Sequence, residues 1–249
     1  MTTLSLWLIA GLAVLSLLSG MLGLGVAFAA LPFFSFFMTD IVHQVQPLTL
    51  LLNGVTALFS AFGFARSGLI DWKKAILLGI VTTVSAPLGS WLAQLIPQIV
   101  ILVIYFASVI FLAFNLFRPI QKREEGQENF KLALILAIPI SVLAGFLGVG
   151  PGFLLLPTLI LVGFEPKRAA GINAFAVTPP SFSALIPHLK TAVWDPTLTL
   201  ILLVVGAGLS FLGARITSSF VPNQRLKQMF GSVIVVMTAY KLFSLIFIR

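Results

Sequence analysis

Residues 20–32 read GMLGLGVAFAALP, and residues 145–157 read GFLGVGPGFLLLP. The two phrases share six identities in thirteen positions without a gap, at an offset of 125 residues in a chain of 249. The shared residues are Gly20, Leu22, Gly23, Gly25, Leu31 and Pro32 in the first copy, and Gly145, Leu147, Gly148, Gly150, Leu156 and Pro157 in the second. A phrase that recurs at half the chain length indicates an internal duplication.

The composition indicates a chain that is embedded in lipid. It is 59% hydrophobic and 9% charged, with a mean hydropathy of +1.12, whereas soluble domains carry about 25% charged residues. Residues 98–117 contain no charge, and about 20 such residues cross the hydrocarbon core of a bilayer as a helix. We therefore predict an all-α polytopic membrane protein whose main partner is the lipid bilayer.

The apolar segments fall into two sets of five on either side of the most polar stretch, RPIQKREEGQENFK. This pattern predicts a first transmembrane repeat at 1–117, a cytoplasmic linker at 118–130 and a second transmembrane repeat at 131–249. The two repeats match beyond the glycine phrase, because Asn53 and Asn173 lie in corresponding third segments.

Basic residues are distributed unevenly over the predicted loops. Numbered from one to nine, the odd loops carry twelve Lys and Arg residues, and the rest of the chain carries three. The positive-inside rule places the odd loops in the cytoplasm, which predicts a multi-pass protein of the cell inner (plasma) membrane with both termini extracytoplasmic. The cytoplasmic loops thereby account for the net charge of +8, and we expect no nucleic-acid partner. An odd number of crossings in each half inverts the second repeat relative to the first, as in many secondary transporters.

The first two segments of each repeat are short. In the first repeat, residues 4–19 and 24–38 number 16 and 15, or about 24 and 22 Å as helix. They are either tilted helices or one re-entrant hairpin whose tip is the glycine turn. The repeats stay inverted in both cases, since a hairpin replaces two crossings by none.

The repeated glycines are candidates for substrate binding. Gly23, Gly25, Gly148 and Gly150 interrupt apolar helical patterns, and glycine readily adopts positive φ. Backbone N–H groups released by such a break find no partner in lipid, and helix N-termini bind anions. The alternative reading is close helix packing through small residues.

Asn53 and Asn173 are further candidates for the same site. A carboxamide at mid-membrane depth is costly unless it is hydrogen-bonded, and it can donate two N–H groups to an oxyanion. The alternative is a hydrogen bond between helices. No Asp or Glu lies deep in an apolar segment, which argues against cation coupling and favours an anion pathway.

Three more polar residues complete the candidate set. Thr178 precedes two prolines that should kink the helix and counts as a substrate-binding candidate. Arg66 and His188 match in the repeat and are candidates for anion access or gating.

The sequence has no cysteine and no HExxH, GxSxG or Walker motif, so we expect neither an enzyme nor a metal site or cofactor.

The duplicated Gly-x-x-Gly-x-Gly…Leu-Pro phrase, the polar position in the third segment and a later Gly…Asp-Trp element resemble the sulfite exporter TauE/SafE family. The resemblance covers nearly the whole chain and carries the four motif glycines, the two asparagines, Pro32 and Pro157. It implies a secondary transporter of small sulfur-containing anions, namely sulfite, an organosulfonate such as sulfoacetate, or thiosulfate, working by alternating access. The first phrase departs from the commoner form at Val26-Ala27, and the second has Pro151-Gly152 there, which leaves the choice of anion open.

Two other functions stay open at this point. An anion channel would share the donor-lined pathway without coupling, and a non-transporting membrane scaffold or assembly factor would use the asparagines for helix contacts alone. The sequence also leaves open the direction of transport, the coupling ion and whether the chain forms a homo-oligomer.

Overall fold

The structure is a computed structural model that describes residues 3–97, 99–100, 103–104, 107, 128–226, 228–229 and 232. The predicted linker at 118–130, the apolar stretch at 98–117 and the last part of the second predicted repeat, from residue 228 on, lie largely outside these residues, so their conformation stays a prediction.

All regular structure in the described part of the chain is helical. The elements are α1 (Thr3–Leu22), α2 (Ala27–Phe34), η1 (Ile41–Val45), α3 (Gln46–Ala65), α4 (Trp72–Ala93), α6 (Phe130–Leu147), α7 (Gly152–Leu161), α8 (Pro166–Ala176), α9 (Thr178–Leu185), η2 (Ile186–His188) and α10 (Pro196–Phe220). Six segments of the described residues are long and apolar enough to cross a membrane. They are Ser5–Leu22, Ile41–Ala65, Trp72–Ala93, Phe130–Leu147, Pro166–His188 and Pro196–Phe220. The predicted all-α polytopic class is confirmed.

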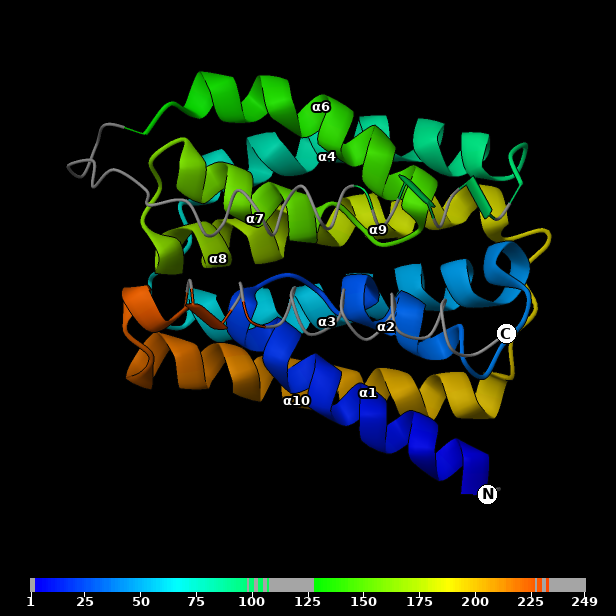
Figure 1. The fold of residues 1–249 in the computed structure, drawn as a ribbon. Coiled ribbons are helices and arrows are strands. Elements are labelled where there is room, and N and C mark those ends of the chain that lie inside the picture. Colours follow the sequence, from blue (N-terminus) through cyan, green and yellow to red (C-terminus); the bar gives the residue numbers. More distant parts are fainter. Residues whose placement is uncertain are drawn as a thin grey trace.

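The helices form two bundles that lie side by side (Figure 1). One bundle contains α1, α2, α3 and α10, and the other contains α4, α6, α7, α8 and α9. The long helices α4 and α10 are exchanged, because α10 packs on α1 and α3 of the first half whereas α4 packs on α6 and α9 of the second. The two bundles meet where α3 contacts α8 and α9.

Glycines allow the exchanged helices to approach closely. A Cβ atom added at Gly20 or Gly213 would overlap with backbone atoms across the α1–α10 contact. Gly145 and Gly89 have the same relation across the α4–α6 contact. The first residue of each glycine phrase therefore serves helix packing through small residues, which was the alternative reading for the phrase as a whole.

Each glycine phrase turns the chain back on itself. In the first hairpin, Phe33 of α2 reaches Gly11 of α1, where its ring occupies the space of a Cβ atom. In the second, the amide of Asn129 before α6 donates to the carbonyl of Val162 after α7 at 2.9 Å. Because α2 has 8 residues and α7 has 10, neither is long enough to span the bilayer. The structure therefore has a hairpin at each glycine phrase, but not the predicted one without a crossing, because its first arms, α1 and α6, have 20 and 18 residues and are long enough to cross a membrane.

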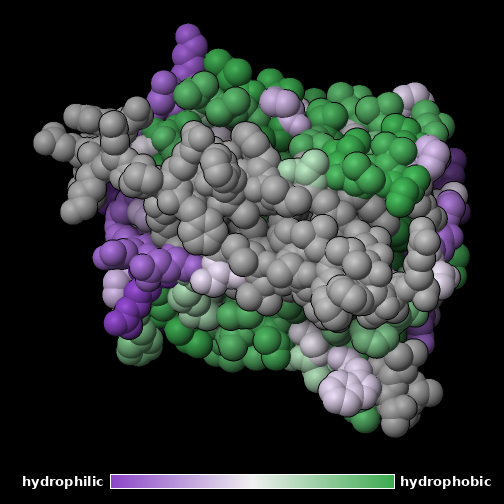
Figure 2. Space-filling model, viewed as in Figure 1, coloured by the Kyte–Doolittle hydropathy of each residue, from purple (hydrophilic) through white to green (hydrophobic). Residues whose placement is uncertain are grey.

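The basic loops lie together at one end of the molecule, which we call the basic end. Lys74 pairs with Glu128 at 2.6 Å, Arg215 donates to Ser67 Oγ at 3.0 Å, and the Lys167 amide donates to Asn223. The second hairpin opens toward this end. At the opposite end the Val193 amide donates to the carbonyl of His43, and the first hairpin opens there (Figure 1). Hydrophilic residues gather at the two ends in Figure 2, with hydrophobic residues along the face between them.

Candidate functional site

The first glycine turn links α1 to α2. Gly23 and Gly25 have φ values of 65° and 70°, the left-handed conformation that glycine adopts without a steric penalty. The turn leaves the first N–H groups of α2 without partners in their own helix. Side chains of α3 accept two of them, since Val26 N donates to Thr56 Oγ1 at 3.1 Å and Ala27 N donates to Asn53 Oδ1 at 2.9 Å.

The second glycine turn repeats this geometry between α6 and α7. Gly148 and Gly150 have φ values of 68° and 69°. The N–H groups of Gly148 and Val149 donate to carbonyls of Gly145 and Ala144, as those of Gly23 and Leu24 donate to Gly20 and Ser19. The duplicated phrase therefore produces the same turn twice, once in each of two oppositely directed hairpins.

The carboxamide of Asn53 lies between the two turns. A Cβ atom added at Gly25 would meet Asn53 Oδ1, and one added at Gly150 would meet Asn53 Nδ2. The side chain is 0% exposed, and its Nδ2 atom donates to Ser181 Oγ of α9 at 2.8 Å. Asn53 thus joins α2 of its own bundle to α9 of the other bundle.

Asn173 joins the same two turns from the opposite bundle. Its Nδ2 atom donates to the carbonyl of Gly23 at 2.7 Å and to that of Gly152 at 3.3 Å. Its Oδ1 atom is buried and has no hydrogen-bond partner in the described part of the chain. The structure thereby brings the two predicted asparagines and the four predicted glycines to one place, where the two bundles meet.

Two backbone donors at this place are unused. Among the described residues, the N–H groups of Gly25 and Gly150 have no hydrogen-bond partner, although both residues are buried. These glycines occupy equivalent positions in the duplicated phrase. Buried backbone N–H groups are rarely left unpaired, so this pair marks the place where a small acceptor would be satisfied.

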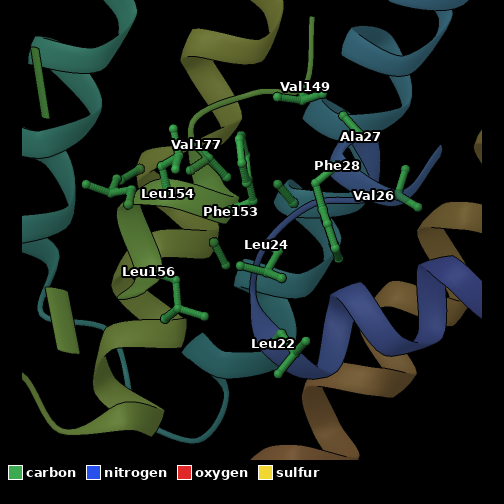
Figure 3. Close-up of a cluster of buried hydrophobic side chains, with 14 of the residues drawn as sticks. Leu22, Leu24, Val26, Ala27, Phe28, Val149, Phe153, Leu154, Leu156 and Val177 are labelled. Atoms are coloured by element: carbon green, nitrogen blue, oxygen red, sulfur yellow. The ribbon is translucent and has the colours of Figure 1, made fainter. Parts of the chain in front are cut away.

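Apolar side chains surround the two turns. Leu24 and Phe28 of the first turn and its helix lie close to Phe153 of the second (Figure 3), and all three belong to the buried core. An acceptor between the turns would therefore sit in a medium of low dielectric constant, where a hydrogen bond is stronger than in water.

The other predicted residues lie apart from the paired turns or serve a different contact. Thr178 is buried and its hydroxyl donates to the carbonyl of Ala174 at 2.9 Å, beside the predicted kink, where α8 ends and α9 begins. Arg66 lies at the basic end with its guanidinium 5.3 Å from the centre of the Phe211 ring. His188 is buried in η2 at the opposite end. Their predicted roles in binding, access or gating stay predictions.

The carboxylates lie at helix ends, as predicted. Asp40, Asp71, Glu165 and Asp195 each directly precede a helix. Partial burial raises the pKa of Asp40, but hydrogen bonds from the backbone and ring of His43 outweigh that effect and leave the pKa below its ordinary value. No group of three His, Cys, Asp or Glu side chains in the described residues could hold a metal ion.

Four polar residues that support the turns were not predicted. Besides Thr56 and Ser181, Thr49 donates to the carbonyl of Gly148 at 3.0 Å, and Gln46 donates to that of Phe146 at 3.3 Å. Their spacing carried a signal, since Gln46, Thr49, Asn53 and Thr56 recur at intervals of three and four residues and so share one face of α3. A polar face on an apolar helix requires partners inside the protein.

A match to a protein-family model identifies the family of this chain. The model of the sulfite exporter TauE/SafE family matches residues 7–241, which include both glycine turns and both asparagines. The chain belongs to the TauE/SafE family. This membership confirms the resemblance found in the sequence and agrees with a multi-pass membrane transporter.

Curated relatives of this TauE/SafE chain carry transporter names. It is 23% identical over 186 residues to a probable membrane transporter protein of Methanocaldococcus jannaschii, covering 71% of this chain and 69% of the relative. It is 23% identical over 212 residues to the probable membrane transporter protein YdhB of Bacillus subtilis, covering 82% and 86%. No solved structure matches the chain. These names indicate a transporter rather than an enzyme.

Proposed function

We propose that the chain is a secondary transporter that carries a small sulfur-containing oxyanion, namely sulfite, an organosulfonate such as sulfoacetate, or thiosulfate. The observation that carries this proposal is the pair of unpartnered N–H groups of Gly25 and Gly150 on either side of Asn53. Backbone N–H groups that are fixed in an apolar environment stabilise an oxyanion without a charged side chain. Asn53 adds a further donor, because among the described residues only one of its two Nδ2 protons has an acceptor, the hydroxyl of Ser181.

Asn173 has a different part in the proposal. Both of its Nδ2 protons are directed at carbonyl oxygens, one in each turn. It therefore holds the two turns in register while the bundles are closed. When the bundles separate, its N–H groups become available, and Asn173 then acts as a second carboxamide donor for the anion.

Alternating access would work by rocking one bundle against the other. Gly25, Gly150, Asn53 and Asn173 are all buried, so an anion reaches them only if the contact of α3 with α8 and α9 opens. The hydrogen bonds from Asn53 to Ser181 and from Asn173 to Gly23 cross that contact. The bonds from Gln46 to Phe146 and from Thr49 to Gly148 also join the two bundles and would break in the same movement. Separation of two bundles around a buried site is the motion of carriers that open alternately to each side.

The orientation in the membrane is part of the same proposal. The basic end would face the cytoplasm by the positive-inside rule, and the end with His43 and His188 would face the other side of the inner membrane. Both termini then lie on the extracytoplasmic side.

A binding experiment tests the proposal. Thermal unfolding of the purified protein is followed in detergent with sulfite, sulfoacetate, thiosulfate, sulfate and chloride in turn. A specific ligand at 100 times its Kd stabilises the folded state by about 2.7 kcal/mol, so one sulfur oxyanion should raise the Tm more than chloride does. A scaffold without a solute would show the same Tm with all five salts.

A further inference from the structure

A groove on the membrane-facing surface lies apart from the glycine turns. It has a volume of about 670 Å³ and runs between α3 and α10. The described residues that line it are Phe59, Phe62, Ala65, Arg66, Gly208 and Phe211. Its volume is typical of a small-molecule site, and none of these residues belongs to the proposed anion site.

The groove is amphipathic along its length. Phe59, Phe62 and Arg66 are spaced three and four residues apart, so they follow one face of α3. The seven steps from Phe59 to Arg66 cover about 10 Å of helix. The arginine is at the basic end, and the aromatic rings extend from it toward the middle of the bilayer. Phe59 is 37% exposed and Phe62 is 50% exposed, so their rings are open to an apolar ligand.

Two arginines mark the polar end of the groove. The Arg66 guanidinium lies 5.3 Å from the centre of the Phe211 ring, a geometry that holds the cation over the aromatic face. Arg215 follows Phe211 by one helical turn. Its guanidinium donates to Ser67 Oγ at 3.0 Å, and Ser67 is the residue that follows Arg66. Neither arginine has a carboxylate partner in the described part of the chain. This end of the groove is therefore positively charged.

The apolar part of the groove has room for a chain. Gly208 is exposed, and nothing lies within 4 Å of the position where its Cβ atom would be. This contrasts with Gly213 of the same helix, where backbone atoms of α1 occupy that space. The open glycine leaves a notch next to the exposed phenylalanines, where an acyl chain can lie.

We infer that this groove binds an anionic phospholipid. The phosphate would lie between Arg66 and Arg215, and one acyl chain would follow Phe62, Phe59 and the notch at Gly208. Charge complementarity selects the headgroup, because arginine binds phosphate through several N–H donors. Basic pockets between transmembrane helices have this chemistry. The site shares no residue with the paired glycine turns or the two asparagines, although Arg66 is also the residue predicted from the sequence for anion access.

Native mass spectrometry of the delipidated protein tests the inference. The protein is mixed with equal amounts of phosphatidylglycerol and phosphatidylcholine that carry the same acyl chains. The retained complexes should contain mainly phosphatidylglycerol. Arg66→Gln should reduce that preference by about fivefold, the effect of one basic residue near a lipid surface. Arg168→Gln is the matched control, because Arg168 is at the basic end but outside the groove, and it should leave the preference unchanged.

A second variant separates the acyl-chain contact from the charge. Gly208→Leu fills the notch without removing a basic residue, so it should reduce retention of both lipids while their ratio stays the same. The inference is overturned if Arg66→Gln retains the full preference or if Arg168→Gln loses as much. It is also overturned if the protein retains neither lipid and is found as a dimer, since a second copy then covers the groove.

Discussion

Asn173 in the second half of the chain donates a 2.7 Å hydrogen bond to the carbonyl oxygen of Gly23 in the first half. The bond joins α8 to the tip of the opposite hairpin, and it lies among fully buried residues. A carbonyl that is freed by a helix break inside a membrane protein needs such a partner, because lipid offers none. Asn173 therefore supplies the hydrogen-bond donor that allows the first glycine turn to lie inside the protein, away from water.

Removing this carboxamide should destabilise the protein. Asn173→Ala leaves the carbonyl of Gly23 buried without its donor, at a cost of about 1–3 kcal/mol. Asn223→Ala is the control, because that carboxamide is at the basic end, where water can replace it. Thermal unfolding in one detergent should give a clearly lower Tm for Asn173→Ala than for Asn223→Ala. Equal Tm values would mean that the bond to Gly23 contributes nothing.

The left-handed glycines provide a second test. Gly25 and Gly68 have φ values of 70° and 67°, so alanine at either position meets a backbone penalty of about 1–2 kcal/mol. At Gly25 the new methyl group would also overlap with Asn53, whereas nothing lies within 4 Å of it at Gly68. Gly25→Ala should therefore lower the Tm by more than Gly68→Ala and should displace the carboxamide of Asn53. If the two variants unfold alike, Asn53 does not lie against the first turn.

Close helix contacts should depend on the repeated glycines of the crossing helices. Gly145→Ala places a methyl group against the carbonyl of Ala86, and overpacking of this kind costs about 1–3 kcal/mol. Gly208→Ala meets open space and should be neutral or stabilising, since alanine is the better helix former by about 1 kcal/mol. Tm values of both variants check the difference. A higher Tm for Gly145→Ala would exclude the close approach of α4 and α6.

The orientation can be tested by labelling, because the chain has no natural cysteine. Lys190→Cys and Arg168→Cys each introduce one exposed thiol. Arg168 follows Lys167 at the basic end, and Lys190 lies between His188 and Val193 at the opposite end. In intact cells a membrane-impermeant maleimide should label the thiol at position 190 and reach the thiol at 168 only after the cells are opened. Labelling of both thiols in intact cells would contradict the spanning arrangement, and the reverse pattern would contradict the proposed orientation.

Much of this architecture could be predicted from local sequence signals. Glycine at positions 23, 25, 148 and 150 predicted backbone turns, because only glycine takes positive φ at little cost, and the φ values confirm them. The corresponding positions of Asn53 and Asn173 in the two repeats also predicted that both asparagines belong to one site. These features depend on single residue types and on the internal repeat, and both are visible in the sequence itself.

Long-range partners could not be predicted in the same way. The exchange of α4 and α10 between the bundles depends on which glycine faces which backbone. The sequence has a Leu-Gly pair at 88–89 and another at 212–213, but it does not show what these glycines contact. The hydrogen bond from Asn53 to the hydroxyl of Ser181 could not be predicted either. A serine in an apolar helix commonly bonds to its own backbone, as Ser181 also does with Val177, so its spacing does not show that it faces another helix.

The most direct test of the proposed oxyanion site is counterflow of labelled sulfite in proteoliposomes, with sulfoacetate and thiosulfate as competing anions. We expect saturable uptake by the wild-type protein and by Asn223→Ala. We expect no uptake above empty liposomes for Asn53→Ala, which removes the carboxamide between Gly25 and Gly150. Full uptake by a correctly folded Asn53→Ala variant would contradict the site, and the absence of any sulfur-anion flux in the wild-type protein would contradict the proposed function.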